Sequence, residues 1–374
     1  MLRWTTLLLA MWLVVTPPSS FADDPPQTND RLRELLKQFP DADANRDGVL
    51  TLDEARDYRQ KIAPKKGPAQ AKGKANAAAK AQAASRNDRN LPEPTFADVK
   101  YGSAERNVLD FYKAPSERPT PLVINIHGGG FVGGDKRSSI NAAAVRAMHE
   151  AGISFASIHY RFVDGKETIF PAPQHDGARA VQFLRSKAKE WNIDPQRVAC
   201  MGGSAGAGIS MWIGFHEDLA DPQSEDPVLR QSTRIQAIGT FGGQGTYDPI
   251  EIRQLVGGRA WEHPSIFKVY GVTTAEEALH PTPERKKLYD EASAITHLTR
   301  DDPPLYMVYN EADGPLPENA RPGQGIHHPN FGRQLKQKMD ELGIENVFVY
   351  TPDEPNRNAA KEMLEFFQKY FQAR

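Results

Sequence analysis

The feature that most constrains this chain is a glycine-rich turn between an apolar strand pattern and an apolar helix pattern. Residues 197–200 have the composition of the end of a buried strand, and residues 209–213 have that of a helix. Between them lies Met201-Gly202-Gly203-Ser204-Ala205-Gly206, which contains G-x-S-x-G. This order is typical of a nucleophilic serine at a sharp strand-to-helix turn, because glycines let the strand and helix approach closely. We therefore predict that Ser204 is a nucleophile.

A second glycine-rich turn strengthens this prediction. Residues 121–126 form an apolar run that predicts a buried strand, and His127-Gly128-Gly129-Gly130 follows it. A loop of this kind supplies backbone N–H groups to an oxyanion hole, together with the N–H of the residue after the nucleophile. The predicted oxyanion donors are Gly129, Gly130 and Ala205. His127 is expected to fix the loop and not to transfer protons.

Strand and helix patterns alternate from about residue 96 to the end of the chain. The predicted elements are strands at 153–158, 235–241, 305–309 and 347–350, and helices at 139–150, 174–190 and 359–371. Such alternation predicts an α/β fold with a doubly wound, mostly parallel sheet, whose site lies beyond the carboxyl ends of the strands. Residues 210–300 contain irregular stretches and are expected to form cap and substrate-pocket loops.

These motifs resemble those of α/β-hydrolase esterases with an H-G-G-G loop, namely the hormone-sensitive-lipase-like carboxylesterases and the acetylxylan and feruloyl esterases. Further matching segments are residues 107–112, 133–136, 160–162 and 194–197. The resemblance implies an α/β-hydrolase domain over residues 96–374. It also implies hydrolysis of a carboxylic ester, in an acylated polysaccharide or another small ester, through an acyl-serine intermediate and without a cofactor for catalysis.

The acid and the base are harder to place. The acid is expected after the strand before last, where Asp313 is the first candidate and Glu311 the second. The base is expected after the last strand, but no histidine follows His328. A serine hydroxyl is a poor nucleophile without a base. His328 or His327 could enter the site on the Pro- and Gly-rich loop that follows Asp313.

Two hypotheses therefore stay open at this point. The first is a serine esterase that uses His328 or His327 as its base. The second is a catalytically silent hydrolase fold that binds a ligand, with the histidine pair on its surface.

The N-terminal residues predict export. Arg3 precedes an apolar run over residues 5–15 that is too short to span a bilayer, and small residues at 20 and 22 fit a cleavage site. We expect a signal peptide over residues 1–22, a periplasmic or extracellular location, and no membrane association after cleavage. The only cysteine, Cys200, is expected to be a buried, inert residue. A net charge of −2 gives no sign of a nucleic-acid partner.

Residues 43–54 fit the calcium-loop pattern D-x-[DN]-x-[DN]-G-x₅-E at every fixed position. Ca²⁺ prefers about six to eight oxygen ligands, and the predicted ligands are Asp43, Asn45, Asp47, the carbonyl of Val49, Thr51 and Glu54. Residues 23–60 thus resemble a single EF-hand, a small helical segment that could also dock a partner. The alternative is a polar turn that binds nothing. Residues 61–95, rich in Ala and Lys, predict a flexible linker.

Overall fold

The computed structural model describes residues 32–33, 35–37, 39–51, 54–55, 58 and 91–372. The chain divides into two compact units, residues 1–79 and 80–374, and each is described by itself. The signal peptide expected over residues 1–22 and most of the linker expected over 61–95 lie outside the described residues and stay predictions. Within the described ranges, no helix has the length and apolar character needed to cross a bilayer.

The described part of the first unit includes most of the loop that was predicted to bind calcium, with helical residues before and after it. A short 3₁₀ helix, η1 (Pro40–Ala42), leads into this loop. Ala42, just before the loop, and Leu50, within it, are buried. Gly48 has a φ of 83°, which a side chain would strain, and this explains the glycine in the turn.

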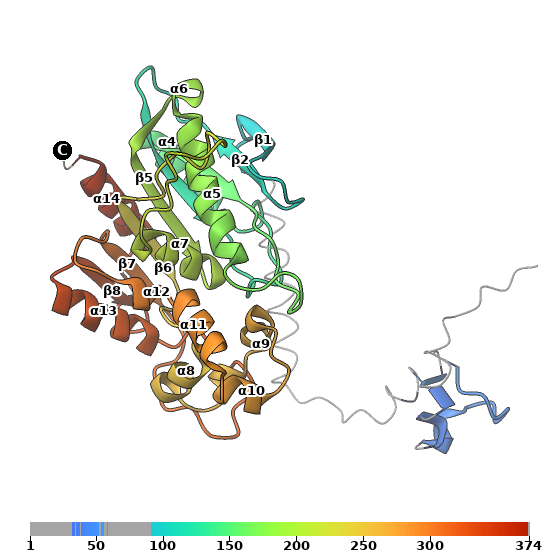
Figure 1. Ribbon diagram of the computed structural model, residues 1–374. Helices are drawn as coiled ribbons and strands as arrows, with labels where there is room; N and C mark the ends of the chain where they lie inside the picture. The colour runs from blue at the N-terminus through green and yellow to red at the C-terminus, as the bar shows by residue number, and fades with distance from the viewer. Residues whose placement is uncertain are drawn as a thin grey trace, which may run out of the picture. The chain divides into compact units, whose positions relative to one another are not determined.

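The second unit is built on one eight-stranded sheet in the order β1-β2-β4-β3-β5-β6-β7-β8 (Figure 1). The strands are β1 (Phe96–Lys100), β2 (Val108–Tyr112), β3 (Thr120–Ile126), β4 (Ser154–Ile158), β5 (Ile193–Gly203), β6 (Ala237–Phe241), β7 (Leu305–Tyr309) and β8 (Asn346–Tyr350). β2 is antiparallel to β1 and β4, and all other neighbours are parallel. The predicted doubly wound, mostly parallel α/β sheet is confirmed.

Helices cover both faces of the sheet, and each face encloses a hydrophobic core. On one face, α4 (Ala142–Glu150) and α14 (Ala359–Gln372) pack on the sheet through Val145, Met148 and Phe367. The other face is covered by α5 (Ala172–Ser186), α6 (Ala188–Trp191), α7 (Ala205–Phe215) and α13 (Asn330–Leu342). Because β3 is covered on both faces, all of its residues are buried, which explains its continuous apolar pattern.

The prediction that residues 210–300 form loops is wrong in part, because much of this region is helical. It contains α8 (Pro249–Val256), η2 (Ala260–Glu262), α9 (Pro264–Tyr270), α10 (Ala275–Leu279), α11 (Pro283–Ala292) and α12 (Ala294–His297). Asp248, Thr274 and Thr282 cap the N-termini of α8, α10 and α11 with side-chain oxygens that accept backbone N–H groups. These helices are too short to show a clear apolar period in the sequence, so their caps are the main local signal.

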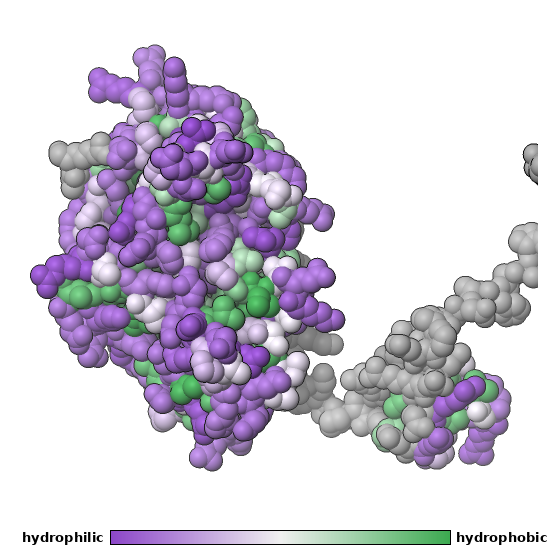
Figure 2. Space-filling model, viewed as in Figure 1, coloured by the Kyte–Doolittle hydropathy of each residue, from purple (hydrophilic) through white to green (hydrophobic). Residues whose placement is uncertain are grey.

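The second unit begins slightly before the expected boundary at residue 96. Leu91 packs against the core beneath α4 and α14. The Thr95 hydroxyl oxygen accepts the backbone N–H of Lys113 at 3.0 Å. On the face drawn in Figure 2 the unit is mostly hydrophilic, and its exposed hydrophobic residues lie in separate small areas. Cys200 is fully buried in β5, and burial raises the pKa of its thiol to about 12.

Candidate active site

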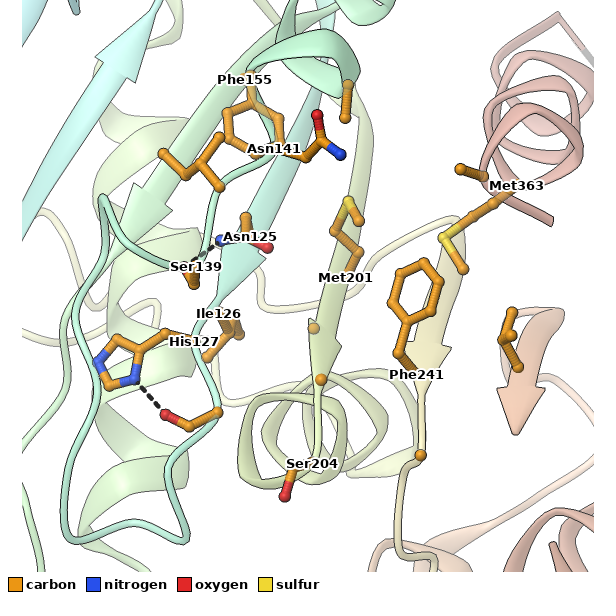
Figure 3. A pocket seen from close by; sticks show the side chains of 18 of the residues that line it. Asn125, Ile126, His127, Ser139, Asn141, Phe155, Met201, Ser204, Phe241 and Met363 are labelled. Atoms are coloured by element: carbon orange, nitrogen blue, oxygen red, sulfur yellow. Dashed lines mark hydrogen bonds between the residues drawn. The ribbon is translucent and has the colours of Figure 1, made fainter. Parts of the chain in front are cut away.

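Ser204 stands between β5 and α7 in strained backbone. Its φ is 52° and its ψ is −120°, a conformation that a non-glycine residue rarely adopts. Its N–H donates to the carbonyl of Phe241 at 2.9 Å, and its own carbonyl accepts the N–H of Gly208 at 3.0 Å. A Cβ atom on Gly206 would collide with the carbonyl oxygen of Ile126, so only glycine allows this close approach of α7 to β3. The turn presents Ser204 beyond the carboxyl end of β5 (Figure 3).

The glycine loop that follows β3 lies beside this serine. Gly129 and Gly130 have φ values of 117° and 60°, and both line one cavity together with Ser204 and Ala205. Within residues 91–372, the backbone N–H groups of Gly129, Gly130 and Ala205 have no protein acceptor. Ala205 is the first residue of α7, where an N–H lacks an intrahelical acceptor. The three predicted oxyanion donors are thus near Ser204 and available to a ligand oxygen.

His127 is buried under the glycine loop. Its Nδ1 lies 2.7 Å from the carbonyl oxygen of Gly128, and its ring stacks on Tyr160 with centroids 4.4 Å apart. Burial lowers the pKa of His127 to about 4, so the ring is neutral near pH 7. These contacts fit the expected role of His127 in fixing the loop.

His327 is the histidine that reaches Ser204. Its Nε2 lies 2.8 Å from the Oγ of Ser204, within hydrogen-bonding distance. The Nε2 of Gln244 donates to the carbonyl of Ile326 at 2.5 Å and ties the histidine loop to the segment after β6. Burial lowers the pKa of His327, and the negative charge of Glu311 partly opposes this. A buried, neutral imidazole beside a hydroxyl is suited to accept its proton.

His328, the first choice for the base, is directed away from Ser204. It is 3 % exposed. Its Nδ1 accepts the backbone N–H of Asn330 at 3.1 Å, so its Nε2 carries the proton and donates to the carbonyl of Gly314 at 3.2 Å. Because both ring nitrogens form hydrogen bonds to the backbone, His328 stabilises the conformation of its loop.

Asp313, the first choice for the acid, also lies elsewhere. Its Oδ1 accepts from Nη1 of Arg333 at 2.8 Å, and its Oδ2 pairs with the other terminal nitrogen of that guanidinium. This ion pair lowers the pKa of the Asp313 carboxyl. The second choice, Glu311, is the carboxylate beside the base, because its Oε2 accepts the backbone N–H of His327 at 2.9 Å.

Ser204 and His327 both line two cavities. The larger, of about 590 Å³, lies on the sheet face that carries α4 and α14, and its wall includes Met201, Phe241 and Met363 (Figure 3). The smaller, of about 420 Å³, contains the glycine loop. A substrate carbonyl held by the glycine loop would therefore lie where the two cavities meet.

Sequence reasoning missed three polar residues of the smaller cavity, namely Gln244, His263 and Ser265. The Nδ1 of His263 accepts the backbone N–H of Ser265 at 3.1 Å, so the neutral ring carries its proton on Nε2. Burial lowers the pKa of His263, and the nearby His327 lowers it further. Gln244 follows two glycines directly after β6, a signal that could have been noticed, whereas His263 and Ser265 lie in the cap without a motif.

The calcium-loop residues are held by their own side chains. The Asp43 carboxylate accepts the N–H groups of Arg46 at 2.7 Å and Gly48 at 2.9 Å. Glu54 accepts the hydroxyl of Thr51 at 2.7 Å, and its other oxygen lies 3.4 Å from the N–H of Asn45, so it reaches back across the loop. These hydrogen bonds lower the pKa of the Glu54 carboxyl. The donor set is all oxygen, which fits Ca²⁺.

The fold and this arrangement define an α/β-hydrolase. The BD-FAE family model matches residues 109–320, more than half of the chain, and the chain belongs to this family. It is 26% identical over 244 residues to the probable carboxylic ester hydrolase LipM of Mycobacterium tuberculosis, covering 64% of this chain and 51% of LipM. It is 26% identical over 230 residues to the esterase LipQ of the same organism, covering 59% and 49%.

The chain spans about half the length of these curated relatives. Among solved structures, the acetyl ester-xyloside bifunctional hydrolase from Caldicellulosiruptor lactoaceticus superimposes with a TM-score of 0.57 at 18% identity, over 75% of this chain and 97% of that one. This likeness concerns the fold. The second unit is thus an α/β-hydrolase domain of the BD-FAE family, and the curated relatives that it matches are named as ester hydrolases.

Proposed function

We propose that the chain is an exported serine carboxylesterase that removes an acyl group from a carbohydrate or another small alcohol. The observation that carries the proposal is the 2.8 Å distance between the Nε2 of His327 and the Oγ of Ser204. A general base must lie within about 2.6–3.2 Å of the proton it abstracts. The alternative, a catalytically silent binding fold, was considered because no base was found after the last strand. The position of His327 supplies a candidate base and speaks for the esterase.

The proposed reaction uses the residues in named roles. His327 accepts the hydroxyl proton while the Oγ of Ser204 attacks the ester carbonyl carbon. The oxyanion that forms accepts hydrogen bonds from the N–H groups of Gly129, Gly130 and Ala205. Collapse breaks the bond to the alcohol oxygen, to which His327 returns the proton. Water then attacks the acyl-serine with His327 again as base, which releases the acid and regenerates Ser204.

Both cavities can accept part of an ester substrate, because each adjoins Ser204 and combines apolar walls with polar groups. The larger cavity has apolar side chains such as Met201 and Phe241 beside the amides of Asn125, Asn141 and Asn310. The smaller cavity offers the Nε2–H of His263 and the hydroxyl of Ser265, which suit the hydroxyl groups of a sugar. An acetylated oligosaccharide and p-nitrophenyl acetate, assayed in parallel, test the proposal. The proposal would be overturned if the chain hydrolysed neither of the two esters.

Replacement of Glu311 tests whether this carboxylate is the acid of the triad. We expect Glu311→Gln to lower kcat by about two orders of magnitude or more, because the imidazolium loses its counter-charge. Glu311 raises the pKa of His327, so its loss should move the acidic limb of the kcat/KM profile to lower pH. Glutamine keeps a side-chain oxygen that can accept the backbone N–H of His327, so this substitution removes the charge and can preserve that hydrogen bond. The measurement is a pH–rate profile.

Asp313→Asn is the matched control, because Asp313 is paired with Arg333. We expect it to leave the acidic limb in place. The assignment of Glu311 would be rejected if Asp313→Asn moved that limb and Glu311→Gln did not.

We also propose that the loop over residues 43–54 binds Ca²⁺ through Asp43, Asn45, Asp47, the Val49 carbonyl, Thr51 and Glu54. Support comes from the all-oxygen donor set and from Glu54 reaching across the loop. Such a site could dock the enzyme to a partner in a Ca²⁺-dependent way. Calorimetry on the full chain should detect one Ca²⁺ ion. Glu54→Gln should weaken binding by about tenfold or more, since a bidentate carboxylate becomes a single amide oxygen.

Asp41→Asn is the control for this prediction, because Asp41 is an exposed acid just outside the loop. It should leave the affinity unchanged. Absence of Ca²⁺ binding at millimolar concentration would refute the site.

A further inference from the structure

Three metal-ligating side chains meet at the end of α7 that is opposite to Ser204. His216 follows the last residue of α7, Glu291 lies in α11, and His297 is the last residue of α12. One potential ligand atom from each lies within 4.8 Å of the other two. The two imidazole rings have centroids 4.7 Å apart. Three elements that are separate in the sequence thus place two imidazoles and one carboxylate around a common point.

The hydrogen bonds of His216 leave one of its ring nitrogens facing a carboxylate. Its Nδ1 lies 3.0 Å from the carbonyl oxygen of Glu217. A carbonyl only accepts hydrogen bonds, so Nδ1 carries the proton. In the neutral ring, Nε2 then presents a lone pair to the Oε1 of Glu291, 3.4 Å away. A proton, a water molecule or a metal ion can bridge two such acceptors.

We propose that His216, Glu291 and His297 bind a divalent transition-metal ion of the Zn²⁺ class. Zn²⁺ prefers imidazole nitrogen and carboxylate oxygen, whereas Ca²⁺ and Mg²⁺ prefer oxygen alone. A metal-bound histidine commonly donates its other ring N–H to a backbone carbonyl, as His216 does to Glu217. A cavity of about 400 Å³ adjoins the three side chains and leaves room for water as a further ligand.

The surroundings hold the ligands in place. The Nε1 of Trp212 donates to the main-chain carbonyl of Glu291 at 2.8 Å, and the indole lies against His216 with centroids 4.3 Å apart. The Nε2 of His297 donates to the same carbonyl at 2.9 Å, so Nδ1 is the nitrogen that this neutral ring offers to an ion. Arg234, which also lines the cavity, is paired with Asp302 at 3.1 Å, so its positive charge is balanced. The ligand residues are therefore positioned before an ion arrives.

This site would be structural. α7 spans Ala205–Phe215, which at 1.5 Å per residue places its two ends about 16 Å apart. An ion bound at His216 would fasten the end of the nucleophile helix to α11 and α12. We expect it to raise the thermal stability of the unit with little effect on turnover at moderate temperature.

The test uses the full chain, stripped of metal with a chelator and kept in millimolar Ca²⁺ so that the N-terminal loop is saturated. Zn²⁺ binding is measured by competition with a chromophoric chelator, and the midpoint of thermal unfolding is measured with and without Zn²⁺. We expect one Zn²⁺ per chain and a rise in Tm of about 5 °C at a hundredfold excess over Kd. His216→Ala and His297→Gln should each remove both effects.

His280→Ala is the matched control, because His280 and Glu276 form an exposed histidine–carboxylate pair 3.6 Å apart without a third ligand. It should bind Zn²⁺ like the parent chain. The Zn²⁺-dependent shift is compared within each variant, so a change in baseline stability cancels. The proposal would be overturned if the parent shows no shift, or if the shift survives in either His216→Ala or His297→Gln. A purely ionic His216–Glu291 pair would give the first of these results.

Discussion

Replacement of Ser204 with alanine is expected to lower the kcat for ester hydrolysis by about five to six orders of magnitude. The reason is chemical: the acyl-enzyme forms on the Oγ of this side chain, and within residues 91–372 it is the hydroxyl that lies 2.8 Å from the Nε2 of His327. Turnover of p-nitrophenyl acetate, corrected for spontaneous hydrolysis, measures the loss. Labelling by a fluorophosphonate, followed by mass spectrometry, should modify Ser204 in the parent chain and fail in the variant.

The Ser204→Ala variant should remain folded, because alanine removes only the hydroxyl and inherits the backbone strain already present at φ 52°. Ser186→Ala, an exposed serine at the end of α5, is a control that should keep full activity and not affect labelling. Substantial turnover in the Ser204→Ala variant would show that another group is the nucleophile.

The two adjacent histidines should give opposite phenotypes. His327→Ala is expected to lower kcat by about four orders of magnitude or more, because Ser204 loses the group that takes its proton. It should leave Tm nearly unchanged. His328→Ala should keep most of the activity. It should lower the free energy of unfolding by about 1–3 kcal/mol, because the Gly314 carbonyl and the Asn330 N–H lose their hydrogen-bond partner in a buried site.

The measurements for this pair are kcat and Tm on the same preparations. Burial lowers the pKa of His327, so the parent should hold its activity at neutral pH and lose it only in the acid range, where the imidazole becomes protonated. A folded His328→Ala variant with unchanged Tm and no activity would exchange the roles of the two residues.

The strained turn at Ser204 and the H-G-G-G loop beside it could be predicted from the sequence, because the pattern of each lies within a few consecutive residues. Gly206 is required by its contact with β3, and the H-G-G-G loop by its positive φ angles, so both leave a visible glycine pattern. The mostly parallel sheet could be predicted from the same kind of local signal, since strands such as β6 and β7 are short, mostly apolar runs that alternate with helices.

No short sequence pattern identifies which residues could be the base and the acid. His327 and His328 are adjacent, and only the direction of each side chain separates them. Asp313 was preferred to Glu311, but the Arg333 guanidinium of α13 captures it, and no local pattern announces that partner. The cap helices were missed because each is short and is started by a capping side chain.

Because His327 follows β7, the loop after β8 does not have to supply the base. The loop after β8 is closed on itself, with the Asp353 N–H donating to the Tyr350 carbonyl at 3.1 Å and Arg357 bonded to Glu354. It leads directly into α14. Because β7 and β8 are parallel neighbours, a loop from either reaches the same edge of the sheet. A search template that demands a histidine beyond the final strand would discard this chain as a dead enzyme. Relatives set aside on that criterion deserve a second search, in the segment between the last two strands.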